Sequence, residues 1–94
     1  MKNKSFSEAG NLSVITLKSI IFDGNPILHV CHDIDYGSWQ FLGFEDADEN
    51  DAAVVALNEI VKFDKSVLEL ADLPLGWHAW RNSVNDPWQR EEYK

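Results

Sequence analysis

The sequence predicts one domain of the α+β class: a small antiparallel sheet, one main helix and an aromatic C-terminal segment. Three observations predict this fold class. The chain has 94 residues, which is enough for one hydrophobic core and too few for two. Two short apolar runs flank a glycine-containing turn across residues 27–44, as in a hairpin. Apolar residues recur at helical spacing across about 51–63.

The N-terminal elements come first. Residues 1–10 are polar and end on glycine, which predicts a flexible tail before a single domain at 11–94. The run 12–22 is rich in β-branched residues and favours a strand. A short helix over 17–22 is the alternative, because a short apolar run fits either period. Residues 23–26 combine the glycine, asparagine and proline that are typical of a turn.

The hairpin is expected from strands at 27–32 and 38–44, joined by the turn 33–37. Because side chains alternate along a strand, His29 and Cys31 should share one face while His32 points to the other. Both faces of this hairpin carry large apolar side chains. We therefore expect a helix to cover one face and the C-terminal segment to cover the other.

The helical half of the domain follows an acidic loop at 45–50. The main helix is expected over about 51–63, with an inward stripe of four apolar residues. Those residues are Val54, Leu57, Ile60 and Val61. Asp64 should cap a second, short helix at 65–71.

The C-terminal segment at 70–90 holds three of the four tryptophans and is broken by Pro74, Gly76 and Pro87. This pattern predicts an ordered segment that wraps around and closes the core. Trp39 and Trp77 are expected to fill that core. A helical turn would lay Arg81 over the ring of Trp77; pairing of Arg81 with Asp72 or Asp86 is the alternative.

Charge and cysteine content narrow the function classes. The net charge is −8, and residues 33–72 hold eleven acids against two bases. Such an acidic belt repels phosphate backbones, which disfavours nucleic acid. It either keeps a small protein soluble and caps its helices, which the pattern favours, or attracts a basic protein partner. A single cysteine excludes an internal disulfide. The first ten residues lack the apolar run of a signal peptide, and no apolar run reaches the length expected of a membrane span. We expect a cytoplasmic protein with no membrane contact.

The candidate interaction surface joins exposed aromatic and basic groups to the acidic loop. Tryptophan and arginine dominate the energetics of protein interfaces, and carboxylates steer a basic partner. The candidates are Trp80, Arg81, Trp88, Glu45, Asp46, Asp48 and Glu49.

Enzymatic and metal chemistry has one candidate cluster, formed by His29, Cys31, His32 and His78. A structural zinc site needs four converging ligands, and the alternation along the strand separates His32 from the first two. A cysteine in an acidic neighbourhood also lacks the positive surroundings that activate a thiolate. The acidic loop does not have the glycine and glutamate spacing of an EF-hand. We therefore predict no catalytic residue, metal ligand or cofactor.

The motifs that carry a resemblance are Trp39-Gln-Phe-Leu42, Asp72-Leu-Pro-x-Gly-Trp77-x-Ala79-x-Arg81 and Pro87-Trp88-x-Arg90. Over about residues 24–90 the chain resembles a family of small bacterial proteins of unknown function, which implies a bacterial origin and a shared fold. In size and charge it is also similar to the acidic immunity proteins that neutralise bacterial toxins.

Two hypotheses about function follow. The first is a non-enzymatic, immunity-like interaction module that binds a basic protein partner. The alternative is a small metal-binding protein or enzyme centred on His29, Cys31, His32 and His78. Neither the partner nor the oligomeric state can be read from the sequence.

Overall fold

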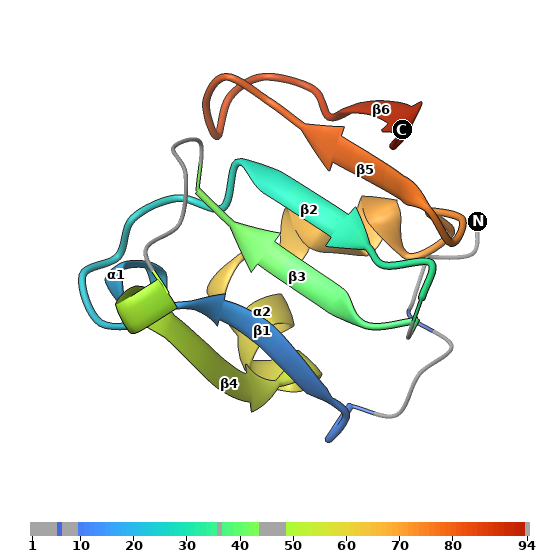
Figure 1. Cartoon of the computed structure of the whole chain (residues 1–94). Coiled ribbons are helices and arrows are strands. Elements are labelled where there is room, and N and C mark those ends of the chain that lie inside the picture. The colour runs from blue at the N-terminus through green and yellow to red at the C-terminus, as the bar shows by residue number, and fades with distance from the viewer. Residues whose placement is uncertain (1–5, 7–9, 36, 44–48, 94) are drawn as a thin grey trace.

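A mixed sheet of six strands forms the centre of the computed structural model, which describes residues 6, 10–35, 37–43 and 49–93 (Figure 1). The strands are β1 (Ser13–Leu17), β2 (His29–His32), β3 (Trp39–Leu42), β4 (Ala52–Ala56), β5 (Trp77–Trp80) and β6 (Gln89–Glu92). The helices are α1 (Lys18–Ile21), η1 (Glu49–Asp51), α2 (Leu57–Phe63) and η2 (Lys65–Leu70), of which η1 and η2 are 3-10 helices.

The strand order is β4-β1-β3-β2-β5-β6. The pair β1–β3 is parallel, and the other neighbouring pairs are antiparallel. The predicted fold class, a small antiparallel hairpin sheet on one main helix, is therefore wrong. The hairpin itself is present: β2 and β3 pair antiparallel, with Val30 opposite Phe41. It forms the middle of a larger sheet instead of the whole of a small one.

The segment 12–22 contains both of the structures that its pattern allowed. β1 occupies its first part and the four-residue α1 its second part. β1 lies between β3 and β4, where its β-branched side chains suit a central strand.

The main helix is shorter than expected, because residues 52–56 form β4 and only Leu57–Phe63 are α-helical. Val54 lies on the same helical stripe as Leu57, but it also belongs to the run Ala-Ala-Val-Val-Ala, which fits a strand equally well. β4 supplies β1 with a second neighbour over its whole length, from Ser13 opposite Ala56 to Leu17 opposite Ala52. This tertiary pairing decides between the two local preferences. The short helix after Asp64 is confirmed as η2, and the Asp64 carboxylate accepts a hydrogen bond from the Ser66 N–H.

The C-terminal segment does not wrap over the sheet: it adds strands to it. β5 pairs with β2, and β6 pairs with β5. Gly76, with a φ of 83°, turns the chain into β5, a backbone conformation that favours glycine. The prediction of a C-terminal layer covering the second face of the hairpin is therefore wrong as well.

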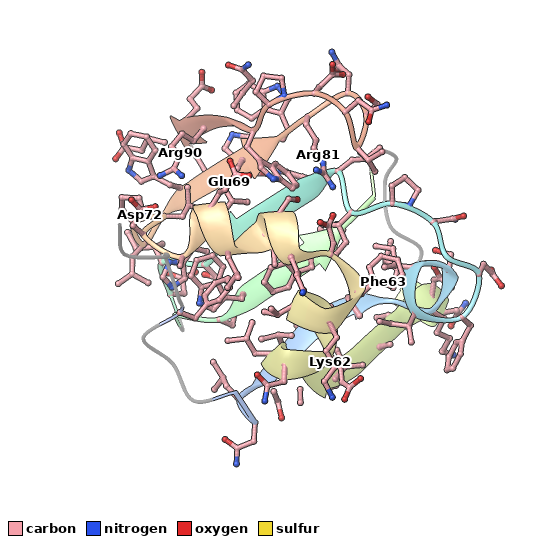
Figure 2. All side chains as sticks on the ribbon, turned by 180° about the vertical axis from the view of Figure 1, so that it is seen from behind. Lys62, Phe63, Glu69, Asp72, Arg81 and Arg90 are labelled. Carbon is pink, nitrogen blue, oxygen red and sulfur yellow. The ribbon has the colours of Figure 1, made fainter. Side chains whose placement is uncertain are left out.

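The two faces of the sheet differ. α2 and η2 lie behind the sheet in the view of Figure 1 and in front of it in Figure 2. The buried core fills the space between these helices and the sheet, and includes Val30, Phe41, Leu57, Ile60 and Leu70. Within the described ranges, no helix covers the opposite side, which we call the open face (Figure 1). No described helix is long and apolar enough to cross a membrane.

The N-terminal tail and the acidic loop fall mostly outside the described residues. Phe6 is described, and its ring makes a T-shaped contact with the Trp39 ring at a centroid distance of 5.0 Å. Glu45, Asp46 and Asp48 lie outside the described ranges, and Glu49 begins η1.

Candidate interaction surface

A cluster of aromatic and imidazole rings occupies the open face across β2, β5 and the end of β6. We call His29, His78, Trp80 and Tyr93 the ring cluster. His78 is its centre, with ring centroids 5.1 Å from His29, 5.1 Å from Trp80 and 4.9 Å from Tyr93. The cluster is therefore one contiguous surface drawn from three separate segments of the chain.

The strand register assembles this cluster. His29 pairs with Trp80, and Cys31 pairs with His78, so all four side chains lie on the same face. Beyond β6, the Tyr93 N–H donates to the Gly76 carbonyl over 2.8 Å. That bond holds Tyr93 beside His78, while 62% of Tyr93 remains exposed.

Polar contacts join His29 to His78 within the cluster and to Cys31 beside it. His29 Nε2 and His78 Nδ1 lie 2.9 Å apart, and Cys31 Sγ lies 3.6 Å from His29 Nε2. Burial lowers the pKa of His29, and the neighbouring His78 lowers it further. Burial also raises the pKa of the Cys31 thiol, to which the charge of Asp33 adds. At neutral pH His29 is therefore a neutral imidazole beside a protonated thiol, which disfavours a nucleophilic role for Cys31.

Two surface hollows flank Tyr93, and Trp77 and Tyr93 line both of them. The first, of about 320 Å³, reaches Cys31 and Gln40 and includes Asp33 and Asp35 in its wall. The second, of about 710 Å³, runs along His78 and β6. Its wall includes Glu91 and Glu92. The hollows thus combine aromatic rings with carboxylates, and among the residues that the structure describes neither is lined by lysine or arginine.

The structure separates the three candidates from the C-terminal segment. Trp80 belongs to the ring cluster on the open face, whereas Arg81, the next residue, points to the helix side of the sheet (Figure 2). Trp88 lies with Arg81, whose Cζ is 4.2 Å from the Trp88 ring centroid. A single interaction surface therefore cannot include Trp80 together with Arg81 and Trp88.

Arg81 is buried, with 3% of its surface exposed, and holds together segments that are distant in sequence. Its Nε and Nη2 donate to the Ile27 carbonyl at 3.1 and 2.9 Å, and its Nη1 donates to Ser66 Oγ at 3.0 Å. Nη2 also pairs with Asp64 Oδ2 at 2.5 Å. We call Arg81, Asp64, Ser66, Ile27 and Trp88 the Arg81 clamp. It fixes β5 to the start of η2 and to the chain before β2.

These partners of Arg81 differ from the ones that the sequence predicted, which were Trp77, Asp72 or Asp86. A helical turn would have placed Arg81 over Trp77. Residues 77–80 form a strand instead, and in an extended chain side chains four residues apart are too far from each other to stack. Neither Asp72 nor Asp86 pairs with it: Asp72 instead accepts from Arg90 at 3.1 Å, near Glu69 and the end of η2 (Figure 2).

The four metal-capable residues divide between the two faces. His29, Cys31 and His78 meet on the open face. His32 lies on the other side, where its ring stacks on Trp39 and its Nδ1 is 2.7 Å from the Leu73 carbonyl oxygen. Among the described residues, no group of three or more His, Cys, Asp or Glu side chains has a geometry that could hold a metal ion.

Tyr93 is the surface residue that the sequence analysis missed. The four residues of β6 are all polar, so no alternation of apolar and polar side chains marks them as a strand. The position of Tyr93 follows only from the pairing of β6 with β5.

Comparisons with known proteins give no relative: no protein-family model, no curated protein and no solved structure matches this chain. The family resemblance carried by the tryptophan motifs therefore stays a prediction.

Proposed function

We propose that the chain is a non-enzymatic, immunity-like interaction module, which binds a basic protein partner in the cytoplasm through its open face. The observation that carries this proposal is the ring cluster, a contiguous surface of four rings beside two hollows lined by carboxylates. The resemblance to immunity proteins supports it through size and a net charge of −8.

The chemistry of this surface suits arginine or lysine side chains. A guanidinium or ammonium group gains from the face of a tryptophan or tyrosine ring, by about 0.5–2 kcal/mol. Tyr93 presents such a ring at both hollows, and Asp33, Asp35, Glu91 and Glu92 would balance the charge of the ligand. The same four carboxylates would repel a phosphate backbone, so nucleic acid is not the partner we propose.

The alternative function, a metal-binding protein or enzyme, gains one supporting observation: the contact of His29, Cys31 and His78. Three features favour the interaction module over it. The fourth candidate, His32, is on the other face; the described residues offer no set of three ligands; and the thiol is protonated.

A comparison of three immobilised baits tests the proposal. The first is the unaltered chain, and the second carries Trp80→Ala with Tyr93→Ala in the ring cluster. The third carries Phe22→Ala with Val84→Ala, a control that removes two exposed apolar side chains outside the cluster. We expect basic proteins captured by the first and third baits to be depleted on the second. Their recovery should fall as salt rises, because ions screen contacts between exposed charges.

Recovery of the same proteins on all three baits would contradict the proposal, provided that the second bait melts cooperatively. Capture of acidic proteins, or capture that does not depend on salt, would contradict the charge argument.

A further inference from the structure

The two edges of the sheet differ in a way that the proposed function does not use. β6 forms one edge with the sequence Gln-Arg-Glu-Glu, and all four residues are exposed. β4 forms the other edge with Ala-Ala-Val-Val-Ala, which has no charged residue. Charged side chains on an edge strand prevent further strands from pairing with it. β6 has this protection and β4 lacks it.

Apolar side chains border β4 on both faces of the sheet. Val54 points to the open face and is 69% exposed. On the helix side, Ile21, Val55 and Phe63 line a hollow of about 320 Å³ with Glu59 and Lys62 at its wall. Phe63 is 39% exposed, and Figure 2 shows it at the end of α2, beside α1. A strand added at this edge would therefore cover apolar surface as well as form backbone hydrogen bonds.

We propose that β4 pairs with β4 of a second copy of this chain, antiparallel, so that one sheet continues through both copies. The sequence of β4 is self-complementary about its central residue. A twofold axis at Val54 would set Val54 opposite Val54, Ala52 opposite Ala56 and Ala53 opposite Val55. Every opposed position is then occupied by alanine or valine, and β-branched pairs stabilise antiparallel strands.

Charge selects a second copy over the basic partner at this edge. β4 offers a basic protein no carboxylate, whereas its uncharged length presents no like charges to itself. Three charged residues near β4 already have partners: Asp51 accepts from the Ser19 hydroxyl at 2.8 Å, and Glu59 pairs with Lys62 at 3.8 Å. The pairing leaves the ring cluster exposed. That cluster lies on β2, on β5 and just beyond β6, toward the edge of the sheet opposite to β4.

Light scattering after size-exclusion chromatography tests this inference with two matched variants. Val54→Lys and Gln89→Lys each add one positive charge at an exposed, open-face position of an edge strand. The unaltered chain and Gln89→Lys should form dimers. Val54→Lys should weaken dimerisation about tenfold or more, since two lysines would face each other across the axis. Salt should strengthen the dimer, because it screens the repulsion between two acidic copies.

Hydrogen exchange on the unaltered chain provides a second readout that needs no variant. The outward amides of β4 should gain protection as protein concentration rises, while those of β6 should not. A monomer at every concentration and salt tested would overturn the inference, as would a Val54→Lys dimer as tight as the unaltered one. These outcomes are independent of the bait comparison, which depends on the ring cluster.

Discussion

Replacing Arg81 with methionine is expected to destabilise the protein by about 3–5 kcal/mol, the usual cost of removing one member of a buried ion pair. The change removes the ion pair with Asp64 and the bonds to the Ile27 carbonyl and Ser66 Oγ. It also removes the cation stacked on Trp88. The free energy of unfolding of a small domain is only about 5–15 kcal/mol, so this change would remove a large part of the total stability. Urea denaturation monitored by tryptophan fluorescence measures the change.

Arg90→Met is the matched control. Arg90 pairs with Asp72 at 3.1 Å and donates to the Glu69 carbonyl at 2.8 Å, but both side chains of the pair are solvent-accessible. Exposed pairs of this kind contribute about 0–1 kcal/mol. Equal decreases in the free energy of unfolding for Arg81→Met and Arg90→Met would contradict the structural role given to the Arg81 clamp.

Replacing Trp39 with alanine is expected to cost about 3–5 kcal/mol, the usual range for a buried aromatic side chain. Trp39 is 1% exposed, and its ring stacks on His32 at 3.9 Å between centroids. Its neighbours Phe6 and Phe41 would border the resulting cavity.

Trp80→Ala serves as the comparison, because it removes the same side chain from the open face. Trp80 is only partly buried, so we expect a smaller loss, of about 1–2 kcal/mol. The free energy of unfolding of both variants, measured in urea, checks the order. A larger loss for Trp80→Ala would mean that the open face is covered in solution, which would also remove the basis of the proposed function.

The sequence predicted local elements better than their assembly. The central hairpin follows from its turn, and the Asp64 cap follows from its position before Ser66, because both depend on neighbouring residues. The parallel pair β1–β3 depends on residues 25 positions apart, such as Ile15 and Gln40, and no local pattern indicates it. The placement of β4 at an edge has the same non-local cause.

The candidate surface could be predicted only in part. Placing His29 and Cys31 on one face and His32 on the other follows from strand alternation, and the register of β2 confirms it. The separation of Trp80 from Arg81 follows from the same alternation, once residues 77–80 are known to be a strand. The sequence hid that fact, because Pro74, Gly76 and Pro87 lie around the strand and made the whole segment look irregular. The contact of His78 with His29 depends on the pairing of β5 with β2, which only the fold reveals.

The most direct test of the proposed open-face function is a chemical-shift map of the isotopically labelled chain titrated with a short arginine-rich peptide, a surrogate for the basic partner. We predict that the largest shifts fall on His29, His78, Trp80 and Tyr93, with smaller ones at the carboxylate-bearing residues of the two hollows. Residues of α2 and η2 should not shift. Shifts centred on those helices, or none at the ring cluster, would contradict the proposal that the open face is the binding surface.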